Sequence, residues 1–121
     1  MLPYCIEHHI GVLSYSPLAK GLLTGKFNTK SRFEDIRASD PEFVGTRFQR
    51  NLRVVEELGK IAAGYGKTVA QLALNWTAGF RGVTAPIVGV KRPSQVLENV
   101  GAVGWTLTEE DRARIDVILR S

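Results

Sequence analysis

Residues 16–26, SPLAKGLLTGK, combine the residue types that could bind a phosphate group. They carry two lysines and two glycines after an apolar run, so positive charge and close-lying backbone N–H groups could face an anion. The nucleotide-binding P-loop, GxxxxGK[ST], does not fit this stretch. Gly21 and Gly25 are one residue too close together, and Phe27 stands where that motif has its magnesium-binding hydroxyl. The stretch therefore indicates a phosphate site on a different scaffold.

A second basic segment, Lys91-Arg92-Pro93-Ser94, precedes an expected helix. Pro93 suits the first turn of that helix, which carries Val96, Leu97 and Val100 and stops at Gly101. The N-terminus of a helix offers unpaired N–H groups and the positive end of the helix dipole, both of which favour anions. The sequence thus contains two candidate halves of one phosphate site.

Two short apolar runs are the expected strands that position these halves. Residues 10–16 (IGVLSYS) and 83–90 (VTAPIVGV) are apolar nearly throughout, which predicts strands buried on both faces of a parallel sheet. The connection 17–47 is polar in its second half and unusually long for a compact domain, which is typical of a functional or mobile segment.

The remaining segments have features that are typical of helices. Residues 2–9 are expected to end a helix, and apolar positions recur at helical spacing from Arg47 to Ala62. Thr68 is expected to cap the next helix, and Thr108 and Asp111 resemble a capping box that opens the last one. The residues expected to face the core are Phe48, Leu52, Val55, Leu58, Ile61, Ala62, Val69, Leu72, Ala73, Trp76, Ile115, Ile118 and Leu119.

The order of strand, loop, helices, strand, loop and helix is a repeated β/α pattern. Such units build either a doubly wound sheet or a barrel, and in both the ligands bind at the carboxyl ends of the strands. The loop after Ser16 and the loop after Val90 therefore lie on the same rim. The α/β class and a shared phosphate site follow from this placement.

Length and composition narrow the alternatives. The 121 residues correspond to about one domain, 1–121. The net charge is +4 with its basic residues dispersed, so nucleic acid is not an expected partner. No long apolar stretch or signal peptide is recognisable, so we expect no membrane association. The single cysteine, Cys5, fits a reducing cytoplasm and a small buried side chain, and the neighbouring His8 and His9 have no further histidine with which to bind a metal.

Three segments carry a resemblance to a known family. The stretches LPYCIEHHIGVLSYSPLAKGLLTGKF, TVAQLALNW and IVGVKRPSQVLENVGAVGW resemble, in order and spacing, the C-terminal portion of the aldo-keto reductases. The resemblance covers nearly the whole chain. It implies the seventh and eighth βα units of a (β/α)₈ TIM barrel, with two parallel strands, four to five helices and no closed barrel. It also implies a nicotinamide cofactor, usually NADPH, which reduces aldehydes and ketones.

The resemblance assigns cofactor contacts to the first loop. Tyr15 falls where an aromatic ring stacks on the nicotinamide. The segment that wraps the pyrophosphate, partly through backbone N–H groups, corresponds to Ser16, Leu18, Lys20 and Gly21. The alternatives are a core or rim tyrosine at position 15 and an ordinary surface turn for the segment that follows.

The second loop departs from the commonest family pattern. Gly89 and Val90 fall where many members carry lysine and serine, and Gln95 falls where they carry arginine. The segment resembles instead a branch with Gly-x-Lys/Arg-x-x-x-Gln, in which Lys91, or alternatively Arg92, would meet the 2′-phosphate. NADPH is expected, and NADH is not excluded. Two further positions, Glu98 and Asn99, fall on the pair that hydrogen-bonds the adenine edge.

The resemblance also implies what these residues do not supply. Carbonyl reduction in the family uses an aspartate, a tyrosine, a lysine and a histidine from earlier strands, and none of those motifs is present here. No catalytic residue is therefore assigned, and a carbonyl substrate is expected only with the missing half. The leading hypothesis is the cofactor-binding C-terminal fragment of a reductase, and the alternative is a non-enzymatic nucleotide-binding or assembly module. Two strands cannot cover their own inner face, so we expect a homo-oligomer.

Overall fold

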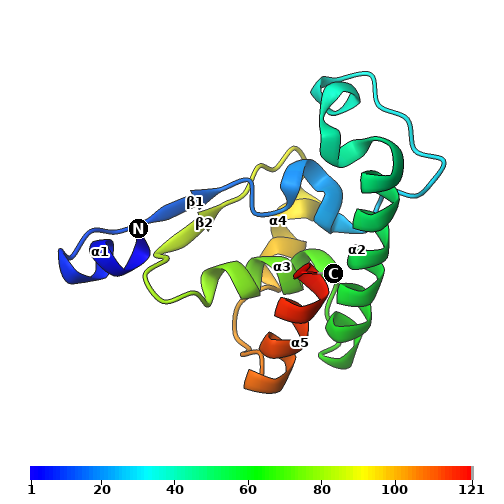
Figure 1. Cartoon of the computed structure of the whole chain (residues 1–121). Helices are drawn as coiled ribbons and strands as arrows, with labels where there is room; N and C mark the ends of the chain where they lie inside the picture. The colour runs from blue at the N-terminus through cyan, green and yellow to red at the C-terminus, as the bar shows by residue number, and fades with distance from the viewer. Residues whose placement is uncertain (121) are drawn as a thin grey trace.

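The computed structural model describes residues 1–120 and forms one α/β arrangement (Figure 1). Two short parallel strands extend from a body of helices, and a small helix lies at their far end. In chain order the elements are α1 (Leu2–Glu7), β1 (Leu13–Tyr15), the 3₁₀ helices η1 (Ala19–Thr24), η2 (Ile36–Ser39) and η3 (Pro41–Phe43), α2 (Gly45–Gly64), α3 (Val69–Ala78), β2 (Ala85–Ile87), α4 (Pro93–Val100) and α5 (Glu109–Arg120).

The parallel pairing of the two strands confirms the predicted sheet. Leu13 pairs with Ala85 and Tyr15 with Ile87, so both strands end at the same edge. The strands are shorter than the predicted runs, and at their start the regular backbone pairing is mixed with a side-chain bond. The backbone N–H of Val12, for example, donates to the side-chain hydroxyl of Thr84 at 3.0 Å.

Only one face of this sheet is covered, which corrects the prediction that the strands are buried on both faces. Ser14 and its partner Pro86 are half-buried, whereas Leu13, Tyr15 and Ile87 are 60%, 82% and 53% exposed. Side chains alternate between the faces of a strand, so the three exposed residues share the open face. The physical reason is that no described segment packs against that face.

The main core lies between the long helix α2 and the helices α3 and α5. Helix α3 begins with the predicted cap: Thr68 accepts from the N–H of Gln71, and the Gln71 side chain accepts from the N–H of Thr68. The buried residues of this core are Leu58, Ile61, Ala62, Leu72, Leu107 and Ile115. The prediction was wrong for Leu119, which lies in the last turn of α5 and is 42% exposed.

A second core organises the long connection 17–47. Its buried residues come from η1, η3 and α2, and the rings of Phe27, Phe33 and Phe43 meet edge to face with centroids 5.0 to 6.0 Å apart. The buried members are Leu22, Phe43, Phe48 and Val55. The connection is thus a folded segment with its own apolar centre, built on three 3₁₀ helices.

Helix α4 ends at Gly101 as predicted, but its apolar side is exposed. Val96, Leu97 and Val100 are 46%, 77% and 61% exposed. The helix is joined to α3 by polar contacts, in which the side chain of Gln71 donates to the carbonyl of Glu98 at 2.8 Å. Among the helices of residues 1–120, none has both the length and the apolar character needed to cross a membrane.

Candidate functional site

The turn that follows β1 has an unusual backbone. Ser16, Ala19, Lys20 and Gly21 all have positive φ angles, of 54°, 49°, 59° and 94°. For a residue with a side chain, this left-handed region costs about 1–2 kcal/mol, because Cβ crowds the following carbonyl. The chain turns sharply here, and Gly21 is the one member of the group for which the conformation carries no such cost.

The hydrogen bonds of this turn determine which amides remain available. The N–H of Ala19 donates to Ser16 at 3.1 Å, and the N–H of Gly21 donates to Leu18 at 3.0 Å. The N–H groups of Leu18 and Lys20 are not donors in these turn bonds. Within the predicted pyrophosphate segment, these two amides thus differ from the Gly21 amide, which is engaged inside the turn.

The side chain of Lys20 forms an ion pair that the sequence analysis missed. Its Nζ lies 2.5 Å from Oδ2 of Asp40, and 43% of the lysine side chain is exposed. The hydrogen bond from Lys20 lowers the pKa of the Asp40 carboxyl, and the backbone N–H of Glu42 acts in the same direction. The ammonium of Lys20 therefore lies beside a carboxylate, at the rim of the sheet.

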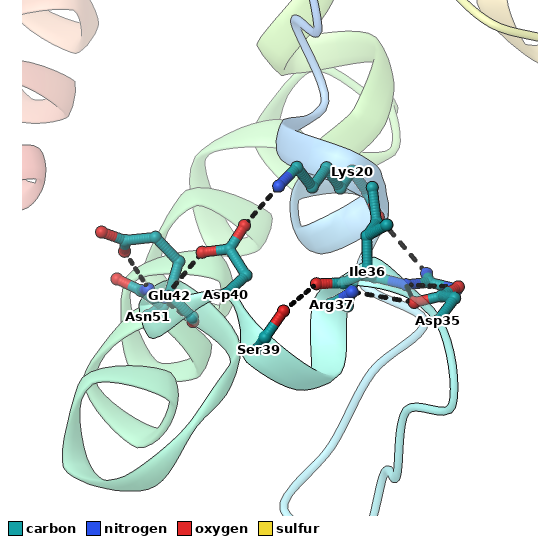
Figure 2. Close-up of polar contacts among 8 residues, drawn as sticks. All are labelled: Lys20, Asp35, Ile36, Arg37, Ser39, Asp40, Glu42 and Asn51. Carbon is teal, nitrogen blue, oxygen red and sulfur yellow. Dashed lines mark hydrogen bonds and ion pairs between the residues drawn. The ribbon is translucent and has the colours of Figure 1, made fainter.

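Arg37 lies on the other side of the same turn, as Figure 2 shows. Its guanidinium donates to both carboxylate oxygens of Asp35, and its Nη1 donates to the backbone carbonyl of Lys20 at 3.4 Å. This pairing holds the pKa of the Asp35 carboxyl well below its usual range. The sequence contained a signal for the positions of these two aspartates. Asp35 and Asp40 each stand one residue before a 3₁₀ helix and cap it, and aspartate is a preferred capping residue.

The second half of the site is the loop between β2 and α4. The side-chain oxygen of Gln95 accepts from the backbone N–H of Lys91 at 2.7 Å and from that of Arg92 at 3.2 Å. This bond folds the loop back on the helix and leaves the Lys91 side chain exposed. A cavity of about 590 Å³ adjoins it, lined by Val90, Lys91, Arg92, Pro93, Val96 and Leu97.

The remaining predicted contacts lie further along α4 or close to the strand ends. Glu98 is engaged with the start of α3, because its carboxylate accepts from the hydroxyl of Thr68 at 3.1 Å. Asn99 is half-buried one residue further on, and Gly89 lies exposed in the loop with open space where a Cβ would be. The ring of Tyr15, 82% exposed, stands on the open face of the sheet.

The strand register brings the two halves to one edge. Tyr15 pairs with Ile87, so the turn 16–21 and the loop 88–92 leave the sheet side by side. The start of α3 lies against the elements that follow both segments, because Thr68 bonds to Glu98 of α4 while Val69 packs against the core that contains Leu22 of η1. No hydrogen bond or ion pair among the described residues joins residues 15–21 to residues 89–99 directly. Within residues 1–120, no three His, Cys, Asp or Glu residues are grouped as they would be to hold a metal ion.

Comparison with known proteins identifies the class to which this rim belongs. The model of the aldo/keto reductase family matches residues 1–120. A glycerol dehydrogenase of Gluconobacter oxydans, AKR11B4, has a solved structure that superposes with a TM-score of 0.93 at 36% identity, over 98% of this chain and 37% of that one. The chain belongs to the aldo-keto reductase family, and its two parallel strands and helices match part of the family's (β/α)₈ barrel.

Curated relatives give the same family. Aldo-keto reductase YhdN of Bacillus subtilis is 38% identical over 100% of this chain and 38% of its own length. The NADP(+) aldo-keto reductase yakc of Schizosaccharomyces pombe is 34% identical over 87% of this chain and 32% of its own. A probable voltage-gated potassium channel subunit beta of Arabidopsis thaliana is 39% identical over 84% of this chain and 32% of its own. The chain thus spans well under half the length of these relatives.

Proposed function

We propose that this chain is the cofactor-holding C-terminal portion of an NADPH-dependent aldo-keto reductase. The observation that carries the proposal is the strand register, which places a lysine-bearing left-handed turn and the start of a helix at one edge of the sheet. Both are features that bind phosphate. The donors suit a dinucleotide, because two amides and the ammonium of Lys20 lie in one loop and Lys91 lies in the other.

The residues that would hold the dinucleotide follow the family pattern. Lys20 and the amides of Leu18 and Lys20 would bind the pyrophosphate, and the exposed Lys91 would bind the 2′-phosphate that distinguishes NADPH from NADH. Tyr15 would stack on the nicotinamide. Gln95 belongs to the same 2′-phosphate segment as Lys91, and Glu98 and Asn99 would lie beside the adenine. When bound, the cofactor supplies the hydride, which goes to a carbonyl carbon.

Hydrogen bonds within the chain would affect two of these proposed roles. Gln95 already bonds to the backbone of Lys91, so it would orient the loop as well as face the ligand. Glu98 already bonds to Thr68, so its carboxylate would approach the adenine from a fixed position. Both side chains thus enter the site pre-ordered, which lowers the entropy cost of binding.

Catalysis would need the rest of the barrel. The family's aspartate, tyrosine, lysine and histidine have no counterparts in this chain, so we expect it to be a fragment that binds cofactor without turning over a carbonyl. A non-enzymatic nucleotide-binding or assembly module is the second candidate. It is favoured by the similarity to a protein whose name is that of a potassium channel subunit.

Two further proposals concern the cellular compartment of the chain and its association. The free Cys5 is consistent with a reducing cytoplasmic compartment. The exposed apolar residues of the sheet and of α4 favour association, either with the remaining βα units or, for the chain alone, with a second copy.

Titration with NADPH tests the proposed function. Calorimetry or nicotinamide fluorescence with the purified chain should show saturable binding, weaker than in a complete reductase because the other loops are missing. A chain that binds no NADPH at millimolar cofactor would contradict a functional rim. Binding of AMP equal to that of NADPH would contradict a site that spans both loops.

A further inference from the structure

We propose that Asp40 and Arg37 are positioning residues for the turn 16–21, holding it in the left-handed conformation that the phosphate site requires. The inference rests on the proposed function, because the turn matters for binding only if it receives the dinucleotide. Both residues come from the far end of the connection 17–47, which gives this segment a role of its own.

The turn needs outside support because its conformation is strained. Ala19 and Lys20 are consecutive left-handed residues with side chains, at φ 49° and 59°. Such residues persist where the surrounding structure over-determines them. The turn's own bonds to Ser16 and Leu18 are the local part of that support. The rest must come from elsewhere in the fold.

Lys20 is held at both ends by this distant segment (Figure 2). Its ammonium lies 2.5 Å from Asp40, and its backbone carbonyl accepts from Arg37. A peptide group is planar, so fixing the Lys20 carbonyl also fixes the direction of the N–H of Gly21. Two contacts therefore set the geometry of the turn at one of its left-handed residues.

The two positioning residues are themselves immobilised. The other oxygen of Asp40 accepts from the backbone N–H of Glu42 at 3.0 Å. The carbonyl of Glu42 in turn accepts from the side chain of Asn51 on α2 at 3.0 Å. Asp40 is thereby connected to the longest helix of the fold.

Arg37 is fixed by charge and by packing together. Asp35 binds its guanidinium through both carboxylate oxygens, and the guanidinium lies 5.3 Å and 5.2 Å from the ring centres of Phe27 and Phe33. Arginine suits this position because its planar group can pair with a carboxylate and stack on aromatic rings simultaneously. Its contact with the Lys20 carbonyl is therefore made from a rigid support.

The ion pair does not withdraw Lys20 from a phosphate. An ammonium has three N–H donors, of which Asp40 uses one, so two remain for a ligand. Asp40 thus has two opposing effects on an anionic ligand. Its charge repels the ligand, whereas its hold on Lys20 orders the binding turn, and these effects predict opposite outcomes when the charge is removed.

The Asp40→Asn variant separates the two effects. Its amide oxygen can still accept from the N–H of Glu42, so the cap of η3 is retained while the ion pair is lost. We expect NADPH to bind about two- to fivefold more weakly, the range that loss of one partly exposed ion pair gives. Equal or tighter binding would overturn the role of Asp40. Glu34→Gln is the matched control, because it removes the same charge from an exposed residue of the same segment. This variant should bind NADPH as tightly as the wild type.

The Arg37→Lys variant tests the second residue at constant charge. A lysine cannot pair in parallel with both oxygens of Asp35, so the donor to the Lys20 carbonyl is no longer held in place. NADPH binding should weaken by about two- to fivefold, the range for loss of one weak hydrogen bond of about 0.5–1 kcal/mol. Unchanged binding would overturn the role of Arg37.

Hydrogen exchange of the ligand-free chain keeps this inference separate from the proposed function. The N–H groups of Ala19 and Gly21 report directly on the turn. We expect them to exchange about two- to fivefold faster in Asp40→Asn and Arg37→Lys than in the wild type. Glu34→Gln should leave the rates unchanged. Unchanged rates in the first two variants would overturn the inference even if NADPH binds. Failure of the wild type to bind NADPH, with faster exchange in both variants, would overturn the proposed function and leave the hold on the turn established.

Discussion

The hydroxyl of Tyr65 donates to Oδ2 of Asp111 at 2.6 Å and accepts from the backbone N–H of Thr108 at 3.1 Å. One phenol thus connects the end of α2 to the beginning of α5. Its ring also packs beside Trp105, with the centroids 5.1 Å apart. The connection matters for the fold because α5 contributes Ile115 to the main core.

The Tyr65→Phe variant should destabilise the chain. It retains the ring and removes the hydroxyl, which leaves the N–H of Thr108 without its acceptor and Asp111 without its closest donor. We expect a loss of about 1–3 kcal/mol in the free energy of unfolding, since each of the two lost hydrogen bonds typically contributes about 0.5–1.5 kcal/mol. Urea unfolding followed by circular dichroism measures it. Tyr4→Phe is the control, since Tyr4 is 59% exposed. Equal losses in both variants would contradict a specific role for Tyr65.

The same contact predicts a pH dependence. The hydrogen bond from Tyr65 is the main reason that the pKa of Asp111 lies below its usual value, and Arg114 adds to it. A folded-state pKa that is depressed gives stability above the unfolded pKa, about 3.9, and this stability is lost as the pH falls through the folded value. The wild type should therefore lose its advantage over Asp111→Asn as the pH falls from about 5 through the depressed folded-state pKa. Urea midpoints across that range would reveal it, and a constant difference between the two proteins would contradict it.

Local signals in the sequence predicted those parts of the fold that local interactions determine. The cap at Thr68 and the start of α4 at Pro93 depend on neighbouring residues, and both are confirmed. The exposure of Leu13 and Leu97 to solvent could not be predicted in this way. Their exposure depends on which other segments pack against them, and the pattern of a buried strand or helix contains no information about that.

The candidate site likewise has one part that the sequence predicted and another that it did not. The pairing of β1 with β2 follows from the repeated β/α pattern, so the meeting of the two loops could be predicted. The ion pair of Lys20 with Asp40 joins residues 20 positions apart across an irregular segment. No periodicity relates such residues, and the aromatic cluster that folds the segment is only visible in three dimensions.

Replacement of Lys91 should change the preference between cofactors. The loop is held through the backbone N–H of Lys91, so Lys91→Ala leaves its fold intact. NADPH binding should weaken roughly tenfold, as expected for loss of a charge-assisted contact, while NADH binding stays the same. Parallel fluorescence titrations measure both. Lys60→Ala removes the same charge from α2 as a control. An equal loss for the two cofactors would contradict a contact with the 2′-phosphate.

The chain alone should not reduce carbonyl compounds. Reduction needs a proton donor of tuned pKa beside the hydride acceptor, and the family's donor and its partners come from strands that this chain does not contain. Purified protein should therefore show no oxidation of NADPH with 4-nitrobenzaldehyde, measured by absorbance, at cofactor concentrations that saturate binding. A preparation from the same host with Lys91→Ala controls for contaminating reductases. Turnover that this variant slows would show that another group supplies the proton.

The open face of the sheet predicts association of the isolated chain. Leu13, Tyr15 and Ile87 expose most of their apolar surface on one side of a two-stranded sheet, which is marginal in water by itself. Burial of each such side chain contributes about 1.5–3 kcal/mol, which is large beside a domain's total of about 5–15 kcal/mol. A two-fold dimer would bury the same face of both copies.

Light scattering at micromolar concentration should therefore give a mass above that of the monomer. Leu13→Lys should shift the chain toward monomer, whereas Val117→Lys, on an equally exposed valine of α5, should not. A wild type that is monomeric and unfolds cooperatively would mean that the open face is stable in water, contrary to this estimate.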